Sequence, residues 1–123
     1  MNTPENVRPW GRYDVLEEMP THQVKRITVS PGGRLSYQRH KRREEFWVII
    51  SGQARLTLDD VESDHGPGEV LIVPFEAKHR VACIGDETLV FIEVQRGDYF
   101  GEDDIERFSD DYGREGTTTP HGE

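Results

Sequence analysis

The hydrophobic residues of the chain gather in short runs that alternate with turn residues from about residue 23 onward. The runs are rich in Val, Ile, Leu, Thr and aromatic residues, a composition typical of strands. Turn residues separate them, as at Ser-Pro-Gly-Gly (30–33) and Gly-Pro-Gly (66–68). We therefore predict strands near residues 23–29, 34–38, 46–51, 53–58, 69–73, 80–83 and 88–95.

Short strands at this regular spacing favour an all-β sandwich or barrel over a parallel sheet covered by helices. One short helix is predicted at residues 103–108, where an aspartate is followed three residues later by a glutamate, as in a capping box. Residues 1–22 are polar and contain three prolines, so we expect an N-terminal arm anchored by Trp10 and Tyr13. The body of the domain is placed at 23–114 and a disordered tail at 115–123.

Composition limits the classes of protein to which the chain can belong. A length of 123 residues fits one domain, and 24 acidic against 15 basic residues argue against non-specific binding to nucleic acid. No apolar run approaches the roughly 18 residues of a membrane span, and the first residues lack the layout of a signal peptide. The single cysteine, Cys83, excludes an internal disulfide and a cysteine-based zinc site. We expect a cytoplasmic domain.

Charge is distributed unevenly along the chain. Seven bases and no acid lie between Lys25 and Arg43, whereas seven acids and one base, Arg107, lie between Asp98 and Asp111. A local basic zone on an acidic protein suits a small anionic ligand better than a nucleic acid. The alternative is that the two segments pair with each other or form solvated surface.

Four residues have the spacing and the chemistry of a metal site. Gln38 and His40 alternate along one predicted strand and therefore share a face, and Glu45 opens the next strand. His79 follows Pro74 in a second turn-and-strand unit. Two imidazole nitrogens, a carboxylate and an amide oxygen suit Zn, Mn, Fe, Co or Ni, and open coordination positions leave room for a substrate oxygen. The alternative is a set of strand histidines with ordinary polar partners.

The segments PGGRLSYQRHKRREEFWVIISG and GEVLIVPFEAKHRVAC resemble the two motifs of the cupin family, whose fold is a double-stranded β-helix, a jelly-roll barrel. Residues 8–114 resemble, more closely, the cupin domain of type II mannose-6-phosphate isomerases, which usually follows a guanylyltransferase domain in one chain. The resemblance implies one divalent metal, with zinc as first choice, held by Gln38, His40, Glu45 and His79. It also implies a homodimer. We predict no guanylyltransferase activity, because 123 residues cannot contain that domain.

The sequence departs from the family pattern at four positions. Arg42 and Phe46 stand where the family often has histidines, and we expect them to alter the mouth of the pocket. Glu76 replaces the usual glycine of the second motif, and Cys83 replaces its usual asparagine. None of these changes removes an expected metal ligand.

The resemblance implies interconversion of mannose 6-phosphate and fructose 6-phosphate through an enediol. Arg43 and Lys25, and then Arg107, are the candidates for binding the phosphate. Glu93 lies in the apolar run LVFIEVQ and is the candidate general base, with Lys25 and Arg107 as further catalytic candidates. Each has a structural alternative: the cations as ion pairs, and Glu93 as a buried carboxylate paired with Lys25 or an arginine.

Two other classes of function stay open from the sequence. One is a non-catalytic cupin that binds a sugar or a sugar nucleotide. The other is a different metal-cupin reaction, such as epimerisation of a nucleotide sugar or dioxygenase chemistry. A fold does not determine a function, so these alternatives are separated only by the site and by assay.

Overall fold

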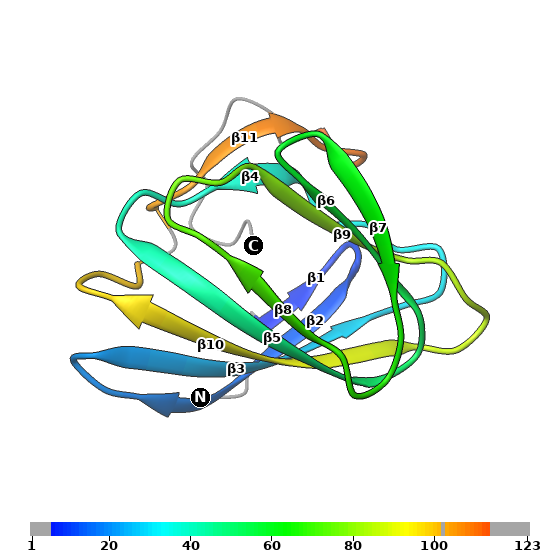
Figure 1. Cartoon of the computed structure of the whole chain (residues 1–123), viewed down its shortest axis with the longest axis horizontal. Coiled ribbons are helices and arrows are strands. Elements are labelled where there is room, and N and C mark those ends of the chain that lie inside the picture. Colours follow the sequence, from blue (N-terminus) through cyan, green and yellow to red (C-terminus); the bar gives the residue numbers. More distant parts are fainter. Residues whose placement is uncertain (1–5, 102, 114–123) are drawn as a thin grey trace.

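The structure, a computed structural model, describes residues 6–101 and 103–113. Two antiparallel sheets face each other (Figure 1), one ordered β1-β2-β3-β10-β5-β8 and the other β11-β4-β9-β6-β7. No helix in these two ranges is long and apolar enough to cross a membrane. The strands are β1 Val7–Arg8, β2 Gly11–Glu18, β3 His22–Val29, β4 Tyr37–Arg39, β5 Arg43–Ser51, β6 Ala54–Leu58, β7 Val61–His65, β8 Val70–Val73, β9 His79–Cys83, β10 Leu89–Gly97 and β11 Glu106–Ser109.

The all-β prediction is confirmed, and each of the seven predicted strands corresponds to a strand with somewhat different ends. Four further strands (β1, β2, β7 and β11) were not predicted. Within residues 1–22, expected to be an arm, β2 pairs with β3 along nearly its whole length. The unpredicted β7 is a polar edge strand, VESDH, so it lacks the apolar alternation by which strands are recognised. The predicted tail, 115–123, lies outside the described residues.

The short helix predicted at 103–108 is wrong. Residues 106–109 form β11, which pairs with β4. Ile105 and Arg107 are buried whereas Glu106 and Phe108 are exposed, which is the period of a strand. No helix forms here for an acidic residue to cap, and Asp104 uses its carboxylate on another segment, accepting the backbone N–H groups of Lys41 and Arg42.

The outward side of β2 carries a buried acid with two partners. Asp14 is buried and accepts hydrogen bonds from Arg12 and Arg26, with closest distances of 2.6 and 2.9 Å. Burial raises the pKa of the Asp14 carboxyl, but the hydrogen bonds and charges of both arginines outweigh it, so its pKa lies below the ordinary value. Asp14 thereby ties β2 to β3 in its charged form.

The inward faces of three neighbouring strands change character along the barrel. Toward one end, inward residues of β3, β5 and β10 are apolar and form part of the core around Trp47 and Phe91. Toward the other end, the same faces carry buried polar and charged side chains. These are Lys25 on β3, Arg43 and Glu45 on β5, and Glu93 and Gln95 on β10. The interior of the barrel is therefore apolar toward one end, and toward the other end it is lined by polar and charged side chains.

The outer face of β5 and the edge strand β8 is apolar. Val48 and Val70 are cross-strand neighbours, as are Phe46 and Ile72, and Ile72 is 55% exposed. Phe46, expected at the mouth of the pocket, lies on this outer face because it alternates with the inward Glu45 and Trp47. Phe46 therefore points away from the barrel interior, and no direct contact with the pocket supports the effect that the sequence predicted for it.

Candidate metal centre

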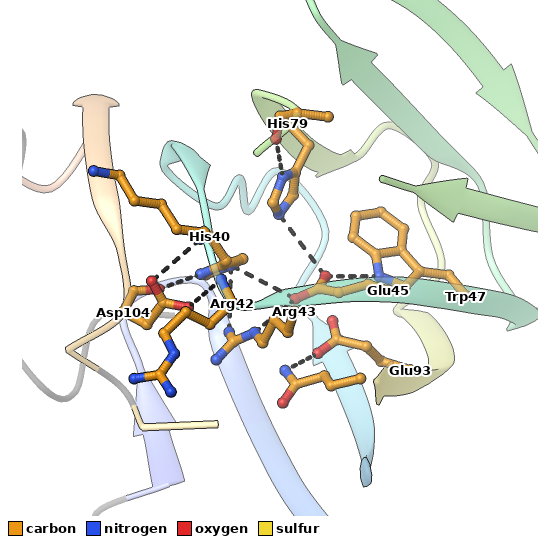
Figure 2. Close-up of polar contacts among 11 residues, drawn as sticks. His40, Arg42, Arg43, Glu45, Trp47, His79, Glu93 and Asp104 are labelled. Carbon is orange, nitrogen blue, oxygen red and sulfur yellow. Dashed lines mark hydrogen bonds and ion pairs between the residues drawn. The ribbon is translucent and has the colours of Figure 1, made fainter. Parts of the chain in front are cut away.

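Three of the four predicted ligands converge inside the barrel. His40 follows β4, Glu45 lies on β5 and His79 opens β9, and their ligand atoms all lie within 4.8 Å of one another. His40 Nε2 is 3.5 Å from Glu45 Oε2, and His79 Nε2 is 3.8 Å from Glu45 Oε1. The three side chains point toward one another in Figure 2, and each is at most 3% exposed. The two sheets thus each contribute to one enclosed centre.

Both imidazoles are oriented by backbone carbonyls. His40 Nδ1 lies 2.6 Å from the Asp104 carbonyl oxygen, and His79 Nδ1 lies 3.0 Å from the Ala77 carbonyl oxygen. A carbonyl can only accept, so Nδ1 carries a hydrogen in each ring. In the neutral form of each ring the lone pair is therefore on Nε2, which faces Glu45 and is the nitrogen that could bind a metal there.

The fourth predicted ligand, Gln38, lies next to this group. Its cross-strand partner in the β4–β9 pair is His79, and its side chain is buried. Among the described residues, Gln38 Oε1 has no hydrogen-bond partner. A buried acceptor without a partner is costly, and a cation would satisfy it. The donor set of two imidazoles, a carboxylate and an amide oxygen therefore fits a divalent transition metal.

Glu45 is held in place by its neighbours on the same face of β5. Trp47 Nε1 donates to Glu45 Oε1 at 3.1 Å, and Arg43 Nε donates to Glu45 Oε2 at 3.3 Å. Arg43 Nη2 also lies 3.3 Å from His40 Nε2. Arg43 thus contacts two expected metal ligands, and it places a fixed positive charge at the edge of the centre.

His40 is neutral at ordinary pH. Burial lowers the pKa of His40 well below its ordinary value, and the charge of Arg43 and the nearby His79 and Lys25 act in the same direction. The hydrogen bond to the Asp104 carbonyl opposes this effect without overcoming it. A neutral imidazole has a lone pair available for a metal.

The predicted catalytic residues form a second polar layer beside the ligands. Glu93 lies between Lys25 on β3 and Trp47 on β5 in the strand register, and the next inward residue, Gln95, lies opposite Glu45. Gln95 donates to Glu93 through a short hydrogen bond that is drawn in Figure 2. Glu93 and Lys25 are both buried. The register therefore places the candidate base on the strand next to β5, and the candidate phosphate ligand Lys25 one strand further away.

Arg107 enters the site from the other sheet. It is the cross-strand partner of Gln38 in the β11–β4 pair and is buried. The inward positions of the second sheet thus run from Arg107 through Gln38 to His79. The three predicted phosphate ligands, Lys25, Arg43 and Arg107, are all buried on the inner side of the barrel.

Several of the other basic residues follow the alternative reading of the charge pattern. Arg34 pairs with Asp111, Arg39 with Glu106, and Arg42 with Asp98. The basic and acidic segments therefore do pair with each other at the surface. Only the bases whose side chains point inward belong to the site.

The remaining family departures have structural explanations. Arg42 lines a surface cavity of about 610 Å³ near the end of the barrel, together with Lys41 and Phe75. Glu76 has a φ of 64°, the left-handed region in which glycine is favoured, and its N–H donates to the His40 carbonyl oxygen at 2.8 Å. Cys83 is buried in the hydrophobic core.

Sequence reasoning missed three residues that shape the site: Trp47, Gln95 and Asp104. Trp47 and Gln95 could have been found from their period-two spacing, because each lies two residues from an expected site residue on a strand. Asp104 gave no such signal, since its contacts to residues 40–42 depend on the fold.

The two facing sheets, with inward histidines and a glutamate at one end, define a cupin domain. The fold is shared with a double-stranded β-helix protein from Klebsiella pneumoniae, at a TM-score of 0.72 and 21% identity over 86% of this chain and 92% of that one. A putative sugar phosphate isomerase from Acidithiobacillus ferrooxidans has a TM-score of 0.58 and 27% identity, covering 62% of this chain and 50% of that one.

The sequence identifies the family. The chain belongs to the mannose-6-phosphate isomerase C-terminal family, whose model matches residues 2–110. The alginate biosynthesis protein AlgA of Pseudomonas aeruginosa is 47% identical over 110 residues, and the mannose-1-phosphate guanylyltransferase of Escherichia coli is 44% identical over 110 residues. The xanthan biosynthesis protein XanB of Xanthomonas campestris is 46% identical over 107 residues. These matches cover 87–89% of this chain but 23% of each relative, so the chain spans about a quarter of their length.

Proposed function

We propose that this chain interconverts mannose 6-phosphate and fructose 6-phosphate through an enediol, in a metal-dependent reaction. The observation that carries the proposal is that three buried cationic side chains lie on the inner side of the barrel with three converging metal-donor residues and the neighbouring Gln38. Membership of the mannose-6-phosphate isomerase C-terminal family supports the same reaction. Relatives named for alginate and xanthan biosynthesis support a place in the supply of sugars for polysaccharides.

The metal site contributes the electrophile. We propose that Gln38, His40, Glu45 and His79 hold one divalent cation. When bound, a cation of this kind supplies positive charge that stabilises the negative charge developing on the carbonyl oxygen of the sugar. Trp47 and Arg43 keep Glu45 oriented for this role by donating to its two carboxylate oxygens. Zinc is the first choice by donor chemistry, and Mn, Co, Ni and Fe are the alternatives.

The proton transfers require a base that can take a proton from carbon and return it. Conversion of the aldose moves one proton from C2 to C1 and a second proton from the C2 hydroxyl to the C1 oxygen. We assign the carbon-bound proton to Glu93, whose carboxylate is buried next to Gln95 and opposite Lys25. Burial favours the neutral form of a carboxyl, whereas a nearby ammonium favours the charged form, and a base for this step needs both forms within reach.

The phosphate requires fixed positive charge in a site that excludes water. Among the described residues on the inner side of the barrel, Lys25, Arg43 and Arg107 are buried together with two carboxylates, Glu45 and Glu93. The cations exceed the carboxylates by one before any metal is added. Arginine suits phosphate because its guanidinium can donate two parallel hydrogen bonds. The charge balance therefore favours a dianionic sugar phosphate over a neutral sugar.

A coupled assay tests the proposal directly. The chain is freed of metal with a chelator, supplied with Zn²⁺, Mn²⁺ or Co²⁺, and assayed for fructose 6-phosphate formed from mannose 6-phosphate. We expect turnover that depends on added metal and is lost in His79→Ala. The matched control is His65→Ala, since His65 lies on the edge strand β7 and not among the convergent donors. Sugar-phosphate binding by calorimetry without turnover for any metal would overturn the isomerase and support a non-catalytic binding domain.

A further inference from the structure

One residue outside the proposed ligand set contacts the metal motif at three points. Asp104 precedes β11, and its carboxylate oxygens accept the backbone N–H groups of Lys41 at 3.2 Å and Arg42 at 3.0 Å. Its own carbonyl oxygen lies 2.6 Å from His40 Nδ1. Figure 2 shows Asp104 beside the turn that follows His40. The side chain of Asp104 therefore holds the turn, while its main chain holds the imidazole.

These two functions are mechanically linked. The carbonyl orients His40 only if it stays at hydrogen-bond distance from the ring. Nothing in the peptide bond at 104 fixes that distance, because the carbonyl belongs to a loop that lies 64 residues further along the chain than His40. The carboxylate supplies the constraint, since two hydrogen bonds from consecutive N–H groups fix both position and direction.

We propose that Asp104 is a positioning residue for the metal centre. By clamping residues 41 and 42 with its carboxylate, it keeps its carbonyl against His40 Nδ1, so that His40 presents the Nε2 lone pair toward Glu45 and His79 before a metal binds. The inference rests on the metal site of the proposed function, but it concerns metal affinity and not turnover. Partners of this kind typically change metal affinity by about 10- to 100-fold when they are removed.

The test measures Co²⁺ binding by the purified chain, with the visible absorption of bound Co²⁺ as the signal. We expect Asp104→Ala to raise the Co²⁺ dissociation constant by about 10- to 100-fold and to shift the absorption bands of the saturated protein. Asp104→Asn keeps one acceptor oxygen and should give an intermediate constant. Thermal unfolding of the metal-free proteins records whether each variant is folded. If the alanine variant does not fold, the Co²⁺ affinity of Asp104→Asn tests the role of Asp104 instead.

The matched control is Asp98→Ala. Asp98 also contacts the same turn, through its side chain to Arg42 Nε at 3.0 Å, but it touches neither the N–H groups of the turn nor His40. Its variant should bind Co²⁺ with a constant within about twofold of the unmodified chain. Equal weakening by Asp98→Ala would overturn a specific role for Asp104, as would an Asp104 variant that is folded and keeps the original constant and spectrum. Failure of the unmodified chain to bind Co²⁺ would overturn the metal site itself, and with it the proposed function.

Discussion

Gln38 offers a substitution whose effects on the metal-free and metal-bound protein should have opposite signs. Its amide oxygen is buried and, within the described part of the chain, lacks a hydrogen-bond partner. The change is Gln38→Leu, which removes the polar atoms and leaves an apolar side chain that is one atom shorter. If Gln38 is a metal ligand, the change should raise the stability of the metal-free protein and lower the stability of the metal-bound protein.

The gain in the metal-free protein follows from the desolvated acceptor. An unsatisfied buried polar group costs about 1–3 kcal/mol, part of which the imperfect fit of leucine will offset. We expect the free energy of unfolding of the metal-free chain to rise by about 1 kcal/mol. For a domain near this size, that corresponds to an increase in Tm of roughly 4 °C.

The loss in the metal-bound protein follows from mass action. At a metal concentration of about 100 times Kd, binding adds about 2.7 kcal/mol to the stability of the unmodified chain. A variant that binds about 100-fold more weakly gains only about 0.4 kcal/mol at the same concentration. The rise in Tm produced by Zn²⁺ should therefore shrink to a small fraction of its original size in Gln38→Leu.

Thermal unfolding in chelator and in Zn²⁺ measures both effects in one experiment. Gln23→Leu is the matched control, because Gln23 Oε1 is also buried without a hydrogen-bond partner in the described ranges but lies on β3, outside the metal centre. The control should keep the full Zn²⁺-induced rise in Tm. An unchanged Zn²⁺ response in Gln38→Leu would show that Gln38 is not a ligand, and a large loss of stability in chelator would refute the reasoning about its unsatisfied oxygen.

Three further predictions address stability, backbone strain and substrate binding. Asp14→Asn should lower the free energy of unfolding by about 1 kcal/mol at pH 7. Because the folded-state pKa of Asp14 is lowered, its contribution is present above the ordinary carboxyl pKa and is lost as pH falls through the folded value, so the difference between the two proteins in urea unfolding should shrink as the pH is lowered below the ordinary carboxyl pKa. Glu76→Gly should raise the free energy of unfolding by about 1 kcal/mol, because the φ of 64° disfavours a side chain, whereas Glu76→Ala should not, and equal urea midpoints for the two variants would contradict this. Arg107→Met should raise the KM for mannose 6-phosphate at least about tenfold, through loss of charge-assisted hydrogen bonds, and an unchanged KM in steady-state assays would remove Arg107 from the phosphate site. The homodimer stays a prediction that sedimentation velocity can test.

The sequence predicted those parts of the fold where one residue type repeats with a fixed period. β3, β5, β6, β9 and β10 combine apolar alternation with clear turns, and all were expected. β2 was missed because GRYDVLEE buries Asp14 on its outward side, and such a charge disguises the pattern until its two arginine partners are known. The helix prediction at 103–108 failed because a cap residue is recognised by its local spacing, whereas Asp104 bonds to N–H groups more than 60 residues away in sequence.

The candidate site shows the same division between local and long-range information. The four expected ligands come from two motifs, and the strand period alone turns Gln38 and Glu45 inward. The partners that orient the two histidines are backbone carbonyls, that of Ala77 for His79 and that of Asp104 for His40. A carbonyl has no residue identity, so no pattern of residue types could have predicted its role.

The change from hydrophobic core to polar site along β3, β5 and β10 makes the protein sensitive to the length of these strands. In β10 the inward residues Glu93 and Gln95 alternate with the outward Ile92 and Val94. A single-residue insertion between Phe91 and Ile92 would exchange the two sets, because side chains on a strand alternate between faces. It would put a carboxylate on the outer face and an isoleucine or valine against the metal donors. A change of one residue in the length of β10 would therefore remove the polar site even where every other residue of the strand is kept.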